Sequence, residues 1–521
     1  MSYPTLILSL PFSSFLGCQS ETATPLHTMA ADSHRCTSVA AELEGTLLIS
    51  GSLFPYFLLV ALEAGGPLRA AVLFAVYPLA ALLGAAFTDD LPLLAMTFLS
   101  TAGLGVGDVA AVARATLPRF FLADLRRSAF RALARHAGER YVVTRLPRLL
   151  AEPFVREYLG ADVRVAGMEL RVVGRRFSGT VASPGVEAGA DRCLGALAAV
   201  LGRDRIVDVG LCSGASGGDR QPAFLQLCHE RHVVSTPEKA AATPLPQSEY
   251  PRPLVFHDGR LVRRPEPLAC LAVFLWVPLG VVLSVTRLLL GFLPHGAGLL
   301  LAAVTGFRIR GELGGAAGPA ASRRRGTLFA CNHQTLMDPV ILSTVLRRKV
   351  TAVTYSLSGF SELIAPIPTV RLTRDRGRDS RIMQSELARG DLVVCPEGTT
   401  CREPYLLRFS PLFAEIAGEV TPTAVRAGGA MFHGSTVRGH KWLDSVFFLM
   451  NPAPWYEIRL LAPVATGGGG DASSRDVANG VQRMIGDELG FECTGLTRRD
   501  KYRMIAGHDG VDARSSSAAA S

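Results

Sequence analysis

Residues 327–342 read TLFACNHQTLMDPVIL, an apolar run followed by a polar turn and a second apolar run. The first run predicts a short buried strand, and the second predicts the helix that follows it. Further apolar runs such as LVVCP (392–396) alternate with helical patterns as far as about residue 505. This alternation is typical of an α/β domain, which we place at residues 312–505.

His333 and Asp338 lie in the polar turn. A carboxylate that hydrogen-bonds an imidazole fixes its tautomer and stabilises the imidazolium, so the pair suits a general base. On a regular helix the two side chains would point about 140° apart, so they meet only if the turn is irregular. A surface histidine beside a helix-capping aspartate would give the same spacing, so other residues have to decide between the two interpretations.

The segment 367–376, IPTVRLTRDR, contains three arginines, including Arg371 and Arg374. The guanidinium group is a planar fork of donors that matches phosphate oxygens. The segment therefore predicts a phosphate clamp. The alternative is a solvated loop, because Asp375 and Asp379 lie close enough in sequence to neutralise the arginines.

The segment 394–402, VCPEGTTCR, predicts a polar turn at the end of a strand. Gly398 allows backbone N–H groups to approach an anion, and Thr399 and Arg402 add donors. Together with a base and the arginine segment, this turn predicts a site for a phosphorylated alcohol.

Four segments resemble, in this order, blocks I to IV of the glycerolipid acyltransferase superfamily: NHQTLMDP (332–339), RLTRDR (371–376), CPEGTTCREP (395–404) and VTPTAV (420–425). The flanking sequence resembles the plant glycerol-3-phosphate acyltransferases of the sn-2 class, which serve cutin, suberin and sporopollenin lipids. FPYFLLVALEAGG (54–66) and VFHDGRLVRRP (255–265) are also similar to that family, so the resemblance spans most of the chain.

The resemblance implies transfer of an acyl group to a hydroxyl of glycerol 3-phosphate, with acyl-CoA as co-substrate and no metal or other cofactor. His333 is then the general base, Asp338 is its partner, and Pro422 belongs to the acyl-CoA pocket. Block III has Cys395 where the superfamily usually has an aromatic residue. The residues implied in binding glycerol phosphate are Arg371, Arg374, Glu397, Gly398, Thr399 and Arg402.

The N-terminal half resembles, as it does in this plant family, a haloacid-dehalogenase phosphatase, which needs a DxDGT turn. Here the turn has Glu42 and Glu44 in place of both aspartates. Each extra methylene moves the carboxylate by about 1.5 Å, and misplacing a reacting group by about 1 Å slows a reaction about 10²-fold. The magnesium motif keeps Asp219 but has Pro222 near the second acid, and residues 1–238 contain no lysine. We therefore expect an inactive phosphatase domain and lysophosphatidic acid as the product.

The composition of the 521 residues is apolar, with 48% hydrophobic and 19% charged residues and a mean hydropathy of +0.27. This excludes a disordered protein and indicates contact with lipid. The net charge of +9 suits phosphorylated substrates and anionic membrane surfaces. Nucleic-acid-binding motifs are absent from the sequence, so we expect no nucleic-acid partner. Ten cysteines without a CxxC pair predict neither a zinc site nor a disulfide scaffold.

We expect an α/β protein with two α/β domains and membrane-associated helices between them. The stretch 268–286 has no charge and predicts a membrane-spanning helix or a hairpin in one leaflet. The apolar region 70–107 predicts further spans or a lipid-facing helical cap. The expected parts are an N-terminal extension (1–38), a degenerate haloacid-dehalogenase-like domain (39–250), a linker with the membrane segment (251–311), the acyltransferase domain (312–505) and a disordered tail (506–521).

Two other functions remain open at this stage. Because blocks I and III are shared across the superfamily, the acceptor could be lysophosphatidate or another lysolipid. A non-catalytic, lipid-binding membrane scaffold is the other alternative. The resemblance implies the endoplasmic reticulum membrane as the location, and residues 1–28, which contain no arginine, do not favour mitochondria.

Overall fold

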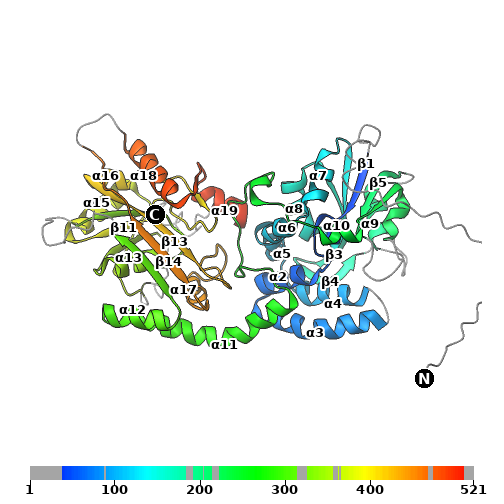
Figure 1. The fold of residues 1–521 in the computed structure, drawn as a ribbon, viewed down its shortest axis with the longest axis horizontal. Coiled ribbons are helices and arrows are strands. Elements are labelled where there is room, and N and C mark those ends of the chain that lie inside the picture. The colour runs from blue at the N-terminus through cyan, green and yellow to red at the C-terminus, as the bar shows by residue number, and fades with distance from the viewer. Residues whose placement is uncertain are drawn as a thin grey trace, which may run out of the picture.

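A computed structural model describes residues 38–86, 90–182, 192–202, 205–213, 222–313, 326–355, 362, 365–467 and 473–509. Two α/β units lie at opposite ends of the molecule, and the long helix α11 (Pro267–Leu290) runs along one edge from the first unit to the second (Figure 1).

The first unit is built on a six-stranded sheet with the order β4-β3-β2-β1-β5-β6. Every neighbouring pair is parallel except β3 with β4, as expected for strands joined by helices. The strands are β1 (Ser38–Glu42), β2 (Glu139–Pro147), β3 (Arg164–Val173), β4 (Arg176–Ala182), β5 (Val207–Cys212) and β6 (Cys228–Val233). The helices are α2 (Phe54–Gly65), α3 (Pro67–Ala86), α4 (Asp90–Thr101), α5 (Val106–Ala115), α6 (Leu117–Asp124), α7 (Arg127–Arg135), α8 (Arg148–Phe154), α9 (Arg192–Leu201) and α10 (Thr236–Ala240).

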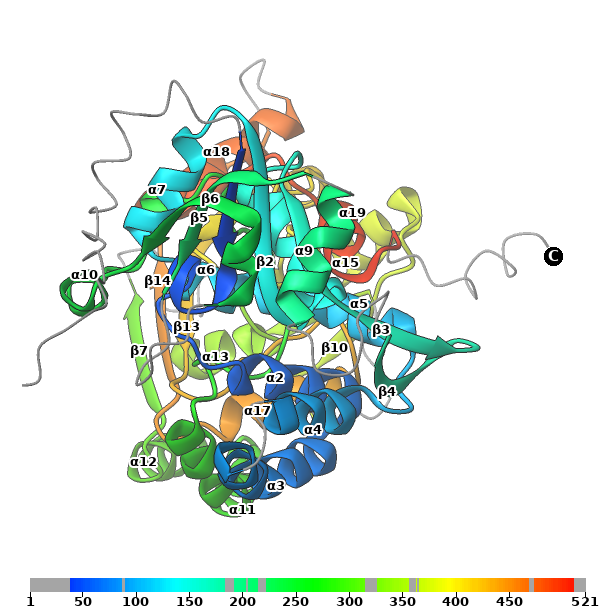
Figure 2. The same cartoon turned by 90° about the vertical axis from the view of Figure 1, so that its right-hand side faces the viewer.

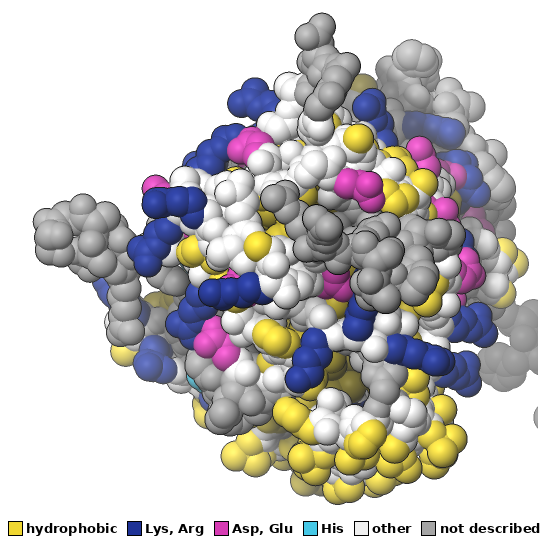
Figure 3. All heavy atoms as spheres, turned by 90° about the vertical axis from the view of Figure 1, so that its left-hand side faces the viewer, with side chains coloured by type: hydrophobic (Ala, Val, Ile, Leu, Met, Phe, Trp, Pro, Cys, Tyr) yellow, Lys and Arg dark blue, Asp and Glu magenta, His cyan; other side chains and the backbone are white. Residues whose placement is uncertain are grey.

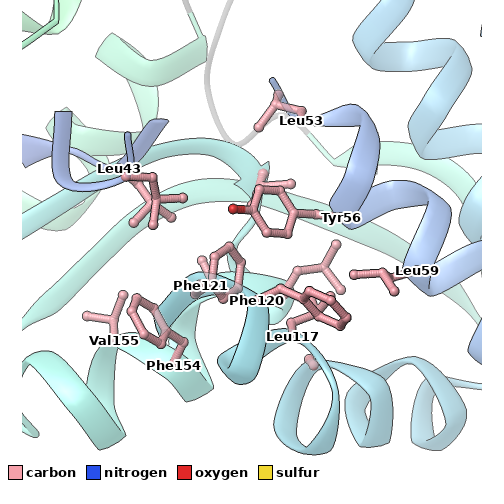
Figure 4. Close-up of a cluster of buried hydrophobic side chains, with 14 of the residues drawn as sticks. Leu43, Leu53, Tyr56, Leu59, Leu117, Phe120, Phe121, Phe154 and Val155 are labelled. Atoms are coloured by element: carbon pink, nitrogen blue, oxygen red, sulfur yellow. The ribbon is translucent and has the colours of Figure 1, made fainter. Parts of the chain in front are cut away.

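The core of this unit contains a row of aromatic rings contributed by α2, α6 and α8 (Figure 4). The rings of Tyr56 and Phe121 stack with centroids 4.5 Å apart, and those of Phe121 and Phe154 lie 4.9 Å apart. Helix α2 is apolar on almost every side, which is the pattern of a helix buried all round. It can therefore sit between the sheet and the outer helices.

The second unit is built on an eight-stranded sheet with the order β10-β9-β11-β8-β13-β14-β7, and β15 pairs with β13. Its strands are β7 (Arg308–Leu313), β8 (Leu328–Cys331), β9 (Thr351–Thr354), β10 (Thr369–Arg371), β11 (Leu392–Val394), β13 (Glu419–Gly428), β14 (Trp455–Leu460) and β15 (Val464–Ala465). A separate pair joins β12 (Tyr405–Leu406) to β16 (Glu492–Cys493). The helices are α12 (His295–Val304), α13 (Asp338–Leu346), α15 (Arg376–Arg389), α16 (Phe413–Ile416), α17 (Trp442–Leu449), α18 (Ser474–Leu489) and α19 (Arg498–Ala506). The α/β fold class expected from the sequence is confirmed.

The apolar helices α3, α11 and α12 lie together along one edge of the molecule in both views (Figures 1 and 2). Helices α3 and α11 are long and apolar enough to cross a membrane, with mean hydropathies of 1.8 and 2.5. The second part of the apolar region 70–107 does not provide another span. Helix α4 has only 12 residues, whereas a spanning helix needs about 20, and it packs against α3 and β4.

Candidate active site

His333 and Asp338 lie at the two ends of the loop that joins β8 to α13. The loop leaves β8 after Cys331, and α13 begins only at Asp338, so the turn between the two residues is not a regular helix. His333 Nδ1 is 2.9 Å from Asp338 Oδ2. Because a carboxylate only accepts hydrogen bonds, Nδ1 carries the hydrogen and Nε2 keeps its lone pair. The pair therefore has the arrangement of a general base and its orienting carboxylate.

Asp338 is fully buried and receives further donors from its own loop and from β14. The backbone N–H of Gln334 donates to it over 2.7 Å, that of Thr335 over 3.1 Å, and the hydroxyl of Tyr456 over 2.9 Å. Several donors on one carboxylate stabilise its charge in a buried place. Tyr456 lies 118 residues away along the chain, and no signal in the sequence linked it to this site.

The charge state of His333 is set by its neighbours. Burial disfavours the imidazolium, but Cys395 and the Asp338 carboxylate outweigh burial and raise the pKa of His333 well above its ordinary value of 6.5. Cys395 belongs to the next strand turn, and its sulfur lies 3.4 Å from that of Cys331. The residue that departs from the superfamily pattern is therefore in direct contact with the site.

Glu397 fixes the backbone of the base. Its carboxylate accepts the N–H of His333 over 2.7 Å and that of Leu407 over 3.0 Å. The N–H of Cys401 donates to the carbonyl of His333 over 2.7 Å, so block III clamps block I from both sides. Burial raises the pKa of Glu397 to about 7. Glu397 also borders the cavity, but among the described residues its carboxylate accepts hydrogen bonds from backbone N–H groups.

His333 opens onto a cavity of about 990 Å³. Gly398 and Thr399 line it, and Gly398 has a φ of +68°, which favours glycine at this turn. The apolar part of the wall includes Leu288 and Gly291 at the end of α11, together with Leu336, Met337, Pro339, Val340 and Ile367. The cationic part consists of Arg287, Arg374, Arg376, Arg408, Lys441, Arg475, Arg498 and Arg499.

The arginine segment places one of its predicted phosphate ligands at the cavity. Arg374 lines the wall, with φ at +70°, and its N–H donates to the buried carboxylate of Asp379 over 2.9 Å. Asp379 also accepts from the N–H of Thr373, and Asp375 accepts from the N–H of Arg378, so both carboxylates bind backbone. Among the described residues, no carboxylate forms an ion pair with the Arg374 side chain.

Two predicted phosphate ligands point elsewhere. Arg371 is exposed and forms an ion pair with Glu362, 3.0 Å from Nη2 to Oε2. Arg402 has a 9% exposed side chain that lies 3.6 Å from the Asp258 carboxylate. Neither borders the cavity. Pro422 sits inside the sheet opposite Ala330 and is not part of the cavity wall either.

Arg498, Arg408 and Lys441 are cavity residues that sequence reasoning missed. All three lie outside the four blocks, and Arg408 and Arg498 are two among many arginines of the chain. Burial and the charge of Arg374 lower the pKa of Arg498. Two positive charges held this close favour an anion between or beside them. The cavity thus combines a base, a cationic wall for an anion and an apolar wall for a hydrocarbon chain.

The degenerate phosphatase turn follows β1, with both glutamates bonded to neighbouring groups of the chain. Glu44 accepts the Thr144 hydroxyl and the N–H of Leu146, the latter over 3.3 Å. Glu42 accepts the N–H of Ser213 over 3.3 Å, and burial raises its pKa to about 7. Asp219 lies outside the described residues. Within the described ranges, His, Cys, Asp and Glu form no group of three or more that could hold a metal ion.

Two family models match the chain. The model described as "Glycerol-3-phosphate acyltransferase RAM2-like, HAD-like domain" matches residues 38–234, and the model "Acyltransferase" matches residues 317–426. The chain is 43% identical to glycerol-3-phosphate acyltransferase RAM2 of Petunia hybrida over 477 residues, which is 90% of this chain and 97% of that protein. It is 42% identical to glycerol-3-phosphate acyltransferase 1 of Arabidopsis thaliana over 505 residues, or 93% and 83% of the two chains.

Among solved structures, the chain matches the 1-acyl-sn-glycerophosphate acyltransferase PlsC of Thermotoga maritima. The match covers 38% of this chain and 80% of that chain, with 18% identity and a TM-score of 0.27.

Proposed function

This chain belongs to the glycerol-3-phosphate acyltransferase family, and on that premise we propose that it transfers an acyl group from acyl-CoA to the sn-2 hydroxyl of glycerol 3-phosphate. The observation that carries the proposal is the His333–Asp338 pair at one wall of a cavity whose other walls are cationic and apolar. The cationic wall suits the phosphate of the acceptor, and the apolar wall suits the acyl chain. The sn-2 position is supported only by the resemblance of the sequence that flanks the blocks.

The residues perform the transfer as follows. His333 Nε2 takes the proton from the acceptor hydroxyl, and the oxygen forms a bond to the thioester carbonyl carbon. Asp338 stabilises the imidazolium formed in this step. The tetrahedral intermediate then collapses, its C–S bond breaks, and the imidazolium returns the proton to the departing CoA thiolate. Atoms and charges balance without a covalent enzyme intermediate.

Arg374 is our proposed principal phosphate ligand. It lines the cavity, and no carboxylate among the described residues forms an ion pair with it. Arg498 adds a second charge nearby. Arg371 and Arg402 are bonded to carboxylates of the chain and are not part of this proposal.

The proposed product is lysophosphatidic acid, because the turn at Glu42 and Glu44 cannot supply the attacking aspartate of a phosphatase. A near-neutral pKa and hydrogen bonds from the chain make Glu42 a poor nucleophile at neutral pH. Release of inorganic phosphate or monoacylglycerol from the acylated product by the purified protein would refute this part of the proposal.

We further propose that α3, α11 and α12 lie in one leaflet of the endoplasmic reticulum membrane. Apolar side chains gather at the lower edge of the face drawn in Figure 3, at the end of the molecule where α12 lies. Leu68, Leu79 and Leu82 of α3, Leu268, Leu275 and Leu289 of α11, and Leu300 and Val304 of α12 are all more than half exposed. Such a patch marks a membrane or protein interaction site. The reticulum location is supported by the resemblance of the sequence.

The opposite face of α11 supports an orientation along the surface. Trp276 Nε1 donates to the carbonyl of Met450 over 2.7 Å, and the Ser284 hydroxyl donates to that of Val446 over 3.1 Å. The buried guanidinium of Arg287 binds the carbonyls of Leu449 and Asn451. Residues 276–287 of α11 are thus attached to α17 and to the two residues that follow it in the acyltransferase unit. A spanning orientation would draw this polar unit into the hydrocarbon.

The reaction is tested in microsomes that contain the full chain, with glycerol 3-phosphate and acyl-CoA as substrates. We expect acylation that stops at the phosphorylated product and is abolished by His333→Ala. The exposed His229 provides the matched control, and His229→Ala should leave the rate unchanged. Acylation of lysophosphatidate but not of glycerol 3-phosphate would establish the other acceptor, and no acylation of either glycerol 3-phosphate or any lysolipid would favour the scaffold.

A further inference from the structure

We propose that the N-terminal phosphatase-like domain holds the acyltransferase site in its active geometry, and that Arg402, bound to Asp258, is the positioning residue that connects the two. This inference rests on the proposed acyltransferase function. It assigns a role to a domain whose own catalytic turn has lost both aspartates.

The connection is made by residues 254–264, which we call the connecting segment. It is hydrogen-bonded to helices of the N-terminal domain. The N–H of Asp258 donates to the carbonyl of Ala115 at the end of α5 over 2.8 Å. The N–H of Arg260 donates to Glu63 of α2 over 2.6 Å. Four successive residues of the segment, 255–258, are buried, so the segment is packed against its neighbours and is not a solvent-exposed linker.

The same residues of the segment bind the acyltransferase domain. The carboxylate of Asp258 accepts the N–H of Val437 over 3.1 Å and lies 3.6 Å from Arg402 Nη2. His257 Nε2 is 2.8 Å from the carboxylate of Glu403, and the N–H of His433 donates to the carbonyl of Arg260 over 2.8 Å. Apolar contacts accompany these bonds in one buried cluster of Ala115, Val255, Phe256, Cys401, Tyr405, Leu407 and Ile505.

Arg402 and Glu403 are the direct continuation of the block III turn. Cys401, next to Arg402, donates its N–H to the carbonyl of His333 over 2.7 Å. Thr399 and Thr400 line the cavity, and the buried Lys501 binds both of them. The ion pair of Arg402 therefore lies one residue from a backbone bond to the base. It does not face the cavity, so its effect on the reaction has to pass through that turn.

The charges around the ion pair make it sensitive to substitution. Arg402 is also 3.3 Å from His257 Nδ1, and Arg438 lies 3.4 Å from Asp258. The side chain of Asp258 is only 2% exposed. When one partner of such a pair loses its charge, the other is left buried without full compensation. The turn is then expected to move until Arg402 finds another partner or water.

The test uses the full chain in microsomes and four variants. We expect Asp258→Asn and Arg402→Lys to lower kcat about tenfold, because a shift of reacting groups by less than about 1 Å is enough for a loss of that size. The KM for glycerol 3-phosphate should stay within about twofold in both. Arg374→Gln, at the proposed phosphate ligand, should raise that KM instead.

The matched control is Asp124→Asn. Asp124 belongs to the N-terminal domain and pairs with Arg264 of the same connecting segment, but it does not touch block III. Its replacement should leave kcat unchanged. A rise of the KM in Arg402→Lys that matches Arg374→Gln would make Arg402 a phosphate ligand, and an unchanged kcat in Asp258→Asn would refute the positioning role.

A second readout separates this inference from the proposed function. Amide hydrogen exchange of the turn 396–403 should be faster in Asp258→Asn than in the unmodified chain, and unchanged in Asp124→Asn. If the chain acylates nothing, the proposed function fails while the exchange result still decides the connection. Equal exchange in the unmodified chain and in both Asp258→Asn and Arg402→Lys would overturn it.

Discussion

Replacing Asp338 with asparagine removes the charge that stabilises the imidazolium and changes almost nothing in volume. The carboxylate accepts hydrogen bonds from His333, from the N–H groups of Gln334 and Thr335, and from Tyr456. An amide has one acceptor oxygen and one donor group, so at least one of these donors meets an N–H₂. Breaking a buried charged pair costs about 3–5 kcal/mol, and each 1.4 kcal/mol is about tenfold in rate. We expect kcat to fall about 10²- to 10⁴-fold.

The assay is the initial rate of acyl transfer to glycerol 3-phosphate in microsomes, at saturating levels of both substrates and equal protein content. Tyr456→Phe is the matched comparison, because it removes one neutral donor from the same carboxylate and leaves the charge. A neutral hydrogen bond is worth about 1 kcal/mol, so that variant should lose no more than about tenfold. If Asp338→Asn kept more than a tenth of the rate while His333→Ala was inactive, Asp338 would be only a helix cap and the proposed stabilisation of the imidazolium would be wrong.

Three further predictions concern the pH profile, the phosphate ligand and the membrane face. Cys395 and Asp338 hold the pKa of His333 above 6.5, so kcat/KM should rise with pH, with an acid midpoint above 6.5. Asp338→Asn should move that midpoint to lower pH. A midpoint at or below 6.5 in the unmodified chain would contradict this assignment. Arg374→Gln should raise the KM for glycerol 3-phosphate about 10- to 100-fold, because the loss of a charged hydrogen bond costs about 1.5–3 kcal/mol. Arg371→Gln should change that KM less than about twofold. Equal effects would place both residues at the phosphate. The double variant Leu275→Asp with Leu279→Asp in α11 should move the protein from the membrane to the soluble fraction. The two leucine side chains are 72% and 51% exposed, and burying each in lipid is worth about 1.5–3 kcal/mol. Ile206→Asp, away from this edge, is the control, and retention of the double variant in the membrane would refute the proposed leaflet contact.

The contact between His333 and Asp338 could be predicted from the sequence because both residues lie in one short loop. The spacing of His333 and Asp338 excludes contact on a regular helix, and the loop is indeed irregular up to Asp338. Blocks I and III follow β8 and β11, which are parallel neighbours, and parallel neighbouring strands carry their polar turns to the same edge of the sheet. The pattern of residues that are close along the chain was therefore enough to predict this contact and the turn beside it.

The arginines were harder to place because the direction of each side chain and its ion-pair partner depend on residues far away in the sequence. Arg371 is the last residue of the edge strand β10 and meets Glu362, while Arg374, three residues later, turns to the cavity. Arg402 follows the polar turn by two residues and points to Asp258, 144 residues earlier in the chain. Burial and charge pairing determine which of these arginines faces the cavity. Both depend on residues that lie far away in the sequence, so the spacing of the arginines could not reveal them. The length of α4 was also misjudged, because an apolar run of 17 residues contained both a short helix and a turn.

The position of α11 in the cavity wall has a consequence for kinetics. Leu288 and Gly291 border the cavity at the same end of the helix that carries exposed leucines. With α11 in the proposed leaflet position, an acyl donor dissolved in the lipid can approach the cavity sideways without passing through water. The rate should depend on the mole fraction of acyl-CoA in the bilayer, so that adding inert phospholipid at constant total acyl-CoA slows the reaction by surface dilution.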